Sequence, residues 1–469
     1  MSFKYHAQKV GDAHYVLPRC GSMKVEAHAF FSDDLYAASE ESLWSQLASG
    51  ASYDGIIGAY LMPDGHSGFG VPIGCVLVTD GVLIQAGSGY DINCGIVCLE
   101  TTLSALDIQD FSKRERWIAE VEKRVATGIG SGRPGLMPVF NDKSALEILR
   151  YGAKSLGVPE DLCERQYIPI PEGTDLNLIE GAYIKVIPQL GSVGSGNHYV
   201  ELLVDEATGD VYAMIHCGSR GYGYQIAEYF FYQGAKLRGL ADTRREESWL
   251  RIDEPLGREY WAYHNSAANF AIANRHIIVR GVQQAIQEVF KGDSSLYYEI
   301  SHNLVQEETL VLPDGTTKRG FVHRKGATRA FPADHPDLIG TKWEKTGHPC
   351  LIPGSMRDGA AILFAGQGSI KSAYSVNHGS GRLIPRGRAR RELVGQQDQI
   401  DLDMSTIERT LGGVQVTGIA INNPHVPLDE CSRVYKNLDS VLDVLVVNQI
   451  ANVHKRLYPV ANLKGLDSR

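Results

Sequence analysis

The chain of 469 residues lacks any apolar run of the ~18 residues that suggest a membrane helix. It also shows no signal-peptide layout over Met1–Gly21, and basic charge is scarce, since 55 acidic residues outnumber 46 lysines and arginines. These absences predict a cytoplasmic protein without a membrane segment and exclude a generally basic nucleic-acid coat. Nucleic-acid binding would then need local basic patches, for which 318–329 and 386–391 are candidates.

Cysteine is also sparse, with eight residues in the whole chain. Only Cys94 and Cys98 lie close together, and no second such pair exists to complete a zinc site of the paired-cysteine kind. The pattern is therefore not that of a disulfide framework, and it favours reduced thiols.

Glycine, by contrast, is abundant at 50 residues and separates the predicted elements. Apolar residues at helical or alternating spacing predict both helices and strands. Helices are expected at 112–127, 145–156, 260–290 and 434–446. Strands are expected at 184–187, 211–216, 297–301, 321–322, 360–365 and 414–421, with a strand–turn–strand unit at 58–77.

The recurrent order of strand, polar glycine-rich loop and helix or strand predicts an α+β enzyme that carries its site on loops. No internal repeat and no interdomain linker is evident, so we expect one large domain over residues 1–469. The densely charged stretch at about 239–258 is predicted to be a surface insertion.

Candidate metal ligands collect in short segments rich in glycine or small residues. Asp91 and Cys94 lie three residues apart between Gly89 and Gly95, and three distant histidines follow in similar segments: His198, His216 and His302. A thiolate can bridge two cations, and imidazole and carboxylate complete a set that suits zinc or manganese. A further histidine, His378, is left over as a candidate nucleophile.

The same segments, in the same order, resemble the RtcB-type RNA ligases. The resemblance rests on Met62–His66, Gly89–Gly95, Gly191–Glu201, His216–Gly221, Ser301–Asn303, His323–Ala327, Pro353–Met356, Asn377–Arg382 and Lys464–Gly465. It implies a single RtcB-like domain with mixed sheets around a dinuclear metal site. It also implies a GTP- and Mn2+-dependent ligase that joins RNA 2′,3′-cyclic phosphate or 3′-phosphate ends to 5′-hydroxyl ends, in RNA repair or tRNA splicing.

The resemblance assigns roles to individual residues. One Mn2+ is expected on Asp91, Cys94 and His198, and the second on Cys94, His216 and His302. His378 is expected to attack GTP and carry GMP. The guanylate pocket is expected to consist of Asn197, His198, Tyr199, Val200, Glu201, His302, Asn303, Pro353, Gly354, Ser355, Met356, His378, Gly379, Ser380, Gly381 and Lys464.

Contacts to RNA are also expected. Phosphate-binding candidates are Arg220, Arg324, Lys325 and Arg382, because guanidinium and ammonium groups bind phosphate oxygens. His66 is a candidate for orienting the RNA end. The implied partners are RNA with broken ends and an archease-type activator.

The sequence departs from the family pattern after Pro353–Met356, where Arg357 and Ala360 stand in place of the usual glycine and serine. The lost hydroxyl at position 360 is expected to remove one contact to guanine or ribose. Two alternatives stay open: a metal-dependent phosphodiesterase or phosphatase, and a catalytically silent RNA-binding relative.

Overall fold

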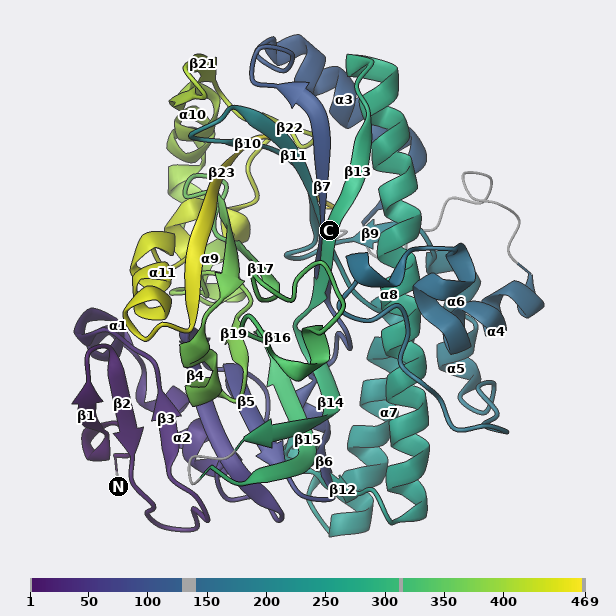
Figure 1. Cartoon of the computed structure of the whole chain (residues 1–469), viewed down its shortest axis with the longest axis vertical. Coiled ribbons are helices and arrows are strands. Elements are labelled where there is room, and N and C mark those ends of the chain that lie inside the picture. Colours follow the sequence, from purple (N-terminus) through teal and green to yellow (C-terminus); the bar gives the residue numbers. More distant parts are fainter. Residues whose placement is uncertain (1, 129–140, 312–314, 466–469) are drawn as a thin grey trace.

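Two mixed sheets organise the chain in a computed structural model that describes residues 2–128, 141–311 and 315–465 (Figure 1). The first has seven strands in the order β1-β2-β3-β4-β5-β15-β14, and the second follows β13-β7-β11-β10-β23-β18-β17 with β22 beside β23. The first sheet comprises β1 (Gln8–Gly11), β2 (His14–Leu17), β3 (Ala27–Ala29), β4 (Ile56–His66), β5 (Ile73–Thr79), β14 (Asn303–Val311) and β15 (Thr317–Lys325). The second comprises β7 (Gly95–Ser104), β10 (Tyr199–Asp205), β11 (Asp210–Cys217), β13 (Ser294–Ser301), β17 (Pro349–Pro353), β18 (Ala360–Ala365), β22 (Ala420–Ile421) and β23 (Ala451–Leu463).

The longest helix, α8 (Pro255–Phe290), runs along the second sheet and contacts β7 and β11 (Figure 1). Pro255 stands at its first turn, where a missing N–H costs nothing, and Lys291 ends it in the left-handed conformation. The remaining α-helices are α1 (Asp33–Ala38), α2 (Glu41–Gly50), α3 (Phe111–Arg124), α4 (Asp142–Tyr151), α5 (Glu180–Tyr183), α6 (Val186–Gln189), α7 (Arg220–Arg238), α9 (Arg386–Glu392), α10 (Gln397–Thr406) and α11 (Leu438–Val447). Among the described residues, no helix has the length and apolar composition to cross a bilayer.

Most of α8 is buried, so its polar residues bind other parts of the chain. Asn269 donates to the carbonyls of Leu149 and Ile168, and Asn274 donates to that of Ser192. Buried polar groups are costly unless they are hydrogen-bonded, so these contacts fix the loops that cross the helix. One of those loops leads to the site described below.

The α+β prediction is confirmed, and most predicted elements lie where the periodicity placed them. The strand predicted at 184–187 is wrong, because this stretch forms the turn after α5 and the start of α6. Val186 and Ala182 are buried here, and α5 and α6 pack against α7. Tertiary packing therefore overrides the β-branched composition of the segment.

In the predicted strand–turn–strand unit at 58–77, the first strand is long, because β4 continues to His66. The pairing of β4 with β5 shifts register between Leu61 and His66, which marks an irregularity with extra residues on β4. Such bulges re-aim side chains. Here the irregular stretch contains Asp64, whose side chain reaches the candidate active site.

Residues 239–258 form the short helix η5 (Asp242–Glu247), β12 (Trp249–Arg251) and the first residues of α8. β12 pairs with β6 (Val82–Ile84), so part of this stretch is tied to the body of the protein. Its status as an insertion stays a prediction. The residues that follow Gly465 lie outside the described residues.

Candidate metal and nucleotide site

The five predicted metal ligands meet at one point although they come from four separate segments. Cys94 Sγ lies 3.3 Å from His198 Nε2 and 3.1 Å from His216 Nε2. His198 Nε2 lies 2.8 Å from Asp91 Oδ2, and His216 Nε2 lies 3.2 Å from His302 Nε2. We call Asp91, Cys94, His198, His216 and His302 the Cys94 cluster. Its thiol lies between two imidazoles, the arrangement that a bridging thiolate requires.

Backbone carbonyls fix which nitrogen of two histidines faces the thiol. His198 Nδ1 lies 2.9 Å from the carbonyl of Val193, and His216 Nδ1 lies 3.1 Å from that of Asn197. A carbonyl only accepts, so each Nδ1 carries a proton and donates it. Each ring therefore turns Nε2 toward Cys94, and Nε2 is the nitrogen through which such a histidine would bind a metal.

The charge states of the cluster also suit a cation. Burial lowers the pKa of His216 and His302 well below the usual histidine value, so both rings are neutral ligands. Burial raises the pKa of the Cys94 thiol to about 12, and a bound cation would reverse this by coordinating the thiolate. Burial by itself would raise the pKa of Asp91. The nearby His198 and Arg220 outweigh the effect of burial and lower the pKa of Asp91.

Gly218 allows the carboxylate of Asp91 to approach the backbone that precedes α7. A Cβ at position 218 would lie 2.3 Å from Asp91 Oδ1, which leaves no room for a side chain. Because Gly218 has no side chain, the carboxylate comes close enough for the N–H of Ser219 to donate to Asp91 Oδ1 at 3.0 Å. The residues of the Cys94 cluster therefore fit one or more divalent cations by their donor atoms and their support.

The candidate nucleophile His378 is held from one side of its ring. Its Nδ1 lies 2.7 Å from Asp64 Oδ2 and 2.8 Å from the carbonyl of Gly326, so Nδ1–H donates to acceptors. In the neutral ring Nε2 keeps its lone pair. Asp64 is fully buried and comes from the irregular part of β4.

His378 stands between two cavities. The larger cavity has a volume of about 260 Å³ and the smaller one of about 210 Å³. His378 and Asn197 line both cavities, and Asp91 and Cys94 line the smaller one. The rings of His378 and His302 are 4.7 Å apart between centroids. The nucleophile candidate therefore faces both a nucleotide-sized space and the Cys94 cluster.

Twelve of the residues predicted for the guanylate pocket line the larger of these two cavities. They are Asn197, Tyr199, Glu201, Pro353, Gly354, Ser355, Met356, His378, Gly379, Ser380, Gly381 and Lys464. His302 and Asn303 line the smaller one. His198 and Val200 line neither, and Val200 packs in the core on the other side of β10.

Glu430 organises the cationic end of the larger cavity. It accepts from Lys464 Nζ at 2.9 Å and from the hydroxyl of Tyr435 at 2.7 Å, and it pairs with Arg386 at 2.8 Å. Burial opposes ionisation of Glu430, yet Lys464 and the arginines lower its pKa to about 2. This carboxylate thus holds Lys464, Arg382 and Arg386 in place at the wall of the cavity.

Sequence reasoning missed Asp64, Glu430 and Tyr435. Asp64 had a signal, because it stands in the same motif as His66, which does line the larger cavity. Glu430 and Tyr435 had none. Their place at the site follows only from the loop that leads into α11.

Two of the predicted phosphate-binding residues are buried in other roles. Arg324 is 1% exposed and both of its terminal nitrogens donate to Glu308, so its prediction as a phosphate contact is wrong. Lys325 lines the smaller cavity, but its Nζ donates to the carbonyl of Val71 at 3.0 Å. Arg382 pairs with Glu430 beside the larger cavity.

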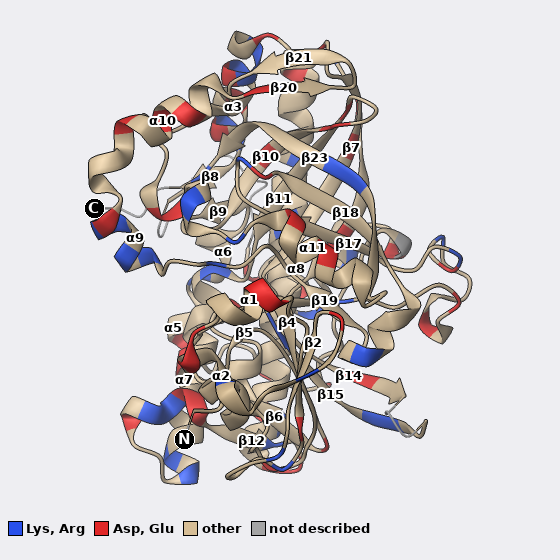
Figure 2. Ribbon diagram, turned by 90° about the vertical axis from the view of Figure 1, so that its left-hand side faces the viewer, with Lys and Arg blue, Asp and Glu red and all other residues tan. Residues whose placement is uncertain are grey.

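The two predicted basic patches also differ. Within 318–329, Arg324, Lys325 and Arg329 are buried. The basic side chains left at the surface are Lys318 and Arg319, and each pairs with a carboxylate, so this stretch is not a contiguous basic patch. The arginines of α9 lie at the surface next to the acidic α10 (Figure 2). Arg386 and Arg390 pair there with Asp429.

Arg357 and Ala360 do not line either cavity. Ala360 is 1% exposed and pairs with Pro353 at the start of β18. The effect of Ala360 on guanine or ribose contacts stays a prediction.

The chain is similar to known proteins over most of its length. The family model described as tRNA-splicing ligase RtcB matches residues 46–465. The chain is 33% identical to the tRNA-splicing ligase RtcB of Thermococcus kodakarensis, with 94% of this chain and 95% of that protein covered. It is 32% identical to the protein of the same name from Archaeoglobus fulgidus (98% of each) and 30% identical to RNA-splicing ligase RtcB homolog 1 of Entamoeba dispar (94% and 88%).

Proposed function

Because the chain belongs to the RtcB family of tRNA-splicing ligases, which supports an RNA-ligase function, we propose the following reaction. The protein uses GTP and Mn2+ to join RNA 2′,3′-cyclic phosphate or 3′-phosphate ends to 5′-hydroxyl ends. GMP is carried on His378 between the two chemical steps. RNA with broken ends is the substrate.

The geometry of His378 carries this proposal. Its Nδ1–H is held by Asp64 and Gly326, so Nε2 is the atom that attacks the α-phosphorus of GTP while pyrophosphate leaves. The new N–P bond makes the ring cationic, and the buried carboxylate of Asp64 stabilises that charge. The cost of burying Asp64 without a full set of hydrogen bonds is consistent with such a role.

The larger cavity offers groups that suit guanine better than adenine. Glu201 Oε1 accepts from Asn462 at 2.6 Å, which leaves its second oxygen for the ligand. Guanine has N–H donors on its Watson–Crick edge, whereas adenine has an acceptor at the corresponding ring nitrogen. Lys464 lies beside Tyr199 in the same wall and supplies a cationic donor.

The Cys94 cluster is proposed to hold two Mn2+ ions. Asp91, Cys94 and His198 would bind one, and Cys94, His216 and His302 the other. When bound, the ions neutralise charge on phosphate oxygens. The Nε2 atoms of His198 and His216, which face Cys94, support this assignment.

Two further transfers complete the reaction. An oxygen of the RNA 3′-phosphate attacks the phosphorus on His378, the N–P bond breaks, and RNA-(3′)pp(5′)G forms. The 5′-hydroxyl of the second RNA then attacks the 3′-phosphorus, and GMP leaves. A cyclic phosphate is first hydrolysed to the 3′-phosphate.

The first test is covalent labelling. The protein is incubated with Mn2+ and GTP or ATP labelled at the α-phosphorus, then separated by denaturing electrophoresis. We expect label from GTP alone, its loss in His378→Ala, and its retention in His425→Ala, a control at an exposed histidine. Label that persists in folded His378→Ala would contradict the assignment.

The second test uses RNAs with defined ends. We expect 3′-phosphate and 2′,3′-cyclic phosphate ends to be joined to 5′-hydroxyl ends. Joining of only 3′-hydroxyl to 5′-phosphate ends would overturn the direction of the reaction. Hydrolysis of the end without joining would favour the phosphodiesterase alternative, and the absence of both would favour a silent RNA-binding relative.

A further inference from the structure

A second buried group of metal-binding side chains lies apart from the Cys94 cluster. It consists of Cys163, His276 and Glu299, whose ligand atoms all lie within 4.8 Å of one another. We call these three residues the Cys163 cluster. Cys163 belongs to the loop that crosses α8, His276 to α8 itself and Glu299 to β13, so three separate elements converge here.

The distances suit a tetrahedral cation. Cys163 Sγ lies 3.5 Å from His276 Nε2. Zinc bonds of about 2.3 Å to sulfur and about 2.0 Å to nitrogen put two tetrahedral ligands about 3.5 Å apart. The pair therefore needs almost no rearrangement to share one ion.

Glu299 supplies the independent evidence for a ligand. It is fully buried, and Arg275 Nε donates to its Oε1 at 2.8 Å. Its Oε2 is buried and has no hydrogen-bond partner among the described residues. A bare buried carboxylate oxygen is costly, and a cation beside it removes that cost.

The histidine of this cluster is ready to coordinate. Burial lowers the pKa of His276 to about 3, so the ring is neutral at physiological pH. Metal ligands must be deprotonated, and a neutral imidazole meets that condition without releasing a proton. Arg275 fixes Glu299, since its Nη1 also donates to the carbonyl of Asn93.

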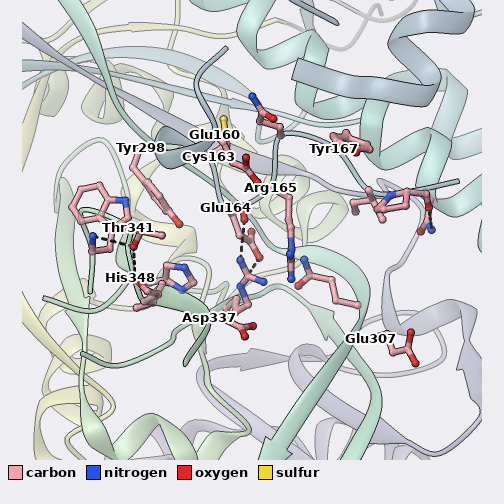
Figure 3. A pocket seen from close by; sticks show the side chains of 18 of the residues that line it. Glu160, Cys163, Glu164, Arg165, Tyr167, Tyr298, Glu307, Asp337, Thr341 and His348 are labelled. Atoms are coloured by element: carbon pink, nitrogen blue, oxygen red, sulfur yellow. Dashed lines mark hydrogen bonds and ion pairs between the residues drawn. The ribbon is translucent and has the colours of Figure 1, made fainter. Parts of the chain in front are cut away.

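One ligand of the Cys163 cluster borders a cavity. Cys163 lines a cavity of about 970 Å³ that is distinct from the two cavities at His378 (Figure 3). Figure 3 shows Cys163 and Glu164 on its wall, with Arg165, Asp337 and His348 around the same space. Four acidic side chains and three arginines line this cavity, so the sum of these side-chain charges is slightly negative, which suits a cation. Water from this cavity can complete the coordination.

We propose that Cys163, His276 and Glu299 form a third divalent-cation site of the zinc type, with a structural role. The ion joins the loop of Cys163 to α8 and β13, and it supports Arg275 from behind. The proposal is independent of the ligase chemistry, because it concerns a cluster that touches neither cavity at His378.

The test uses the full chain with Cys94→Ser, which removes the thiolate of the Cys94 cluster. This protein is loaded with Co2+, and the thiolate-to-cobalt charge-transfer band is measured. We expect the band in Cys94→Ser, its loss in Cys94→Ser/Cys163→Ser, and its retention in Cys94→Ser/Cys98→Ser. Cys98 is a matched control, since it is a buried thiol on β7. Absence of the band from Cys94→Ser, or its persistence without Cys163, would overturn the proposal.

A second measurement needs no substitution at Cys163. Zinc X-ray absorption of the Cys94→Ser protein should show one sulfur at about 2.3 Å among nitrogen and oxygen ligands. The metal content should be about one zinc per chain after dialysis against a weak chelator. A shell of only nitrogen and oxygen, or no retained zinc, would refute the site even if the double variant does not fold.

Discussion

The Cys94 and Cys163 clusters use the same ligand chemistry in different settings. Both combine a buried thiol, imidazole and carboxylate, and Arg275 connects them, since it binds Asn93 next to Cys94 and Glu299 in the other cluster. The Cys94 cluster is built on loops, apart from His216 on β11, and opens toward His378. The Cys163 cluster is built largely on a helix and a strand, and no nucleophile candidate stands beside it among the described residues.

This difference shows what separates a reactive site from a structural one. The two clusters share the same types of ligand, so ligand type alone does not decide whether a cluster is reactive or structural. The reactive site adds two more histidines, a carboxylate that pairs with one of the cluster's own histidines and a nucleotide-sized cavity. In the Cys163 cluster the carboxylate is committed to Arg275, which leaves one oxygen for an ion and none for a substrate.

The largest effect should come from replacing Cys94 and Cys163 by serine in two separate variants. Cys94→Ser should lower ligation on the order of 10³-fold, because a bound metal supplies several kcal/mol of charge stabilisation. Cys163→Ser should leave ligation close to that of the unmodified protein and lower its melting temperature instead. Ligation rates and thermal melts check both; equal loss of activity in the two variants would break the distinction.

The second effect concerns the pH dependence of stability. Burial raises the pKa of Glu201 to about 7, although Lys464 opposes it. The folded state therefore binds the proton of Glu201 more tightly than the unfolded state does. The contribution of Glu201 to the free energy of unfolding is full below the unfolded pKa of about 4.5. It is lost as pH rises through the folded pKa of about 7, and the total loss is about 3 kcal/mol. Denaturant melts of Glu201→Gln should show a flatter profile over this window than the unmodified protein. Identical profiles would contradict the raised pKa.

The third effect tests the support of the nucleophile. Asp64→Asn should slow guanylylation on the order of 10²-fold by removing the charge that stabilises cationic His378, and KM for GTP should change little. Single-turnover labelling measures this. Asp401→Asn is the matched control, because Asp401 holds the exposed His425 at the same 2.7 Å. An Asp64 variant that changes only KM would assign the residue to nucleotide binding.

The smallest effect is on nucleotide affinity. Lys464→Met should raise KM for GTP about tenfold, the value of one charge-assisted hydrogen bond. Metal content should be unchanged, since Lys464 is no ligand of either cluster. A fall in bound metal in this variant would show that the nucleotide cavity and the Cys94 cluster are not separable.

The sequence predicted the residues of the Cys94 cluster because their types and glycine settings are local features. It also predicted most helices and strands from periodicity. It failed at 184–187, where packing against α7 decided the conformation, and at Arg324, where a charged residue in a motif proved to be a buried partner of Glu308. Spacing along the chain does not reveal burial.

By itself the sequence determined the ligand types, the nucleophile candidate and the α+β class, because each is written in short segments. Only the tertiary structure decided that Asp64 holds His378, that Glu430 gathers the cations and that Cys163 meets His276 and Glu299. These contacts join residues from 34 to 314 positions apart. Such distant pairs are set by how the two sheets and α8 pack, and no local pattern encodes them.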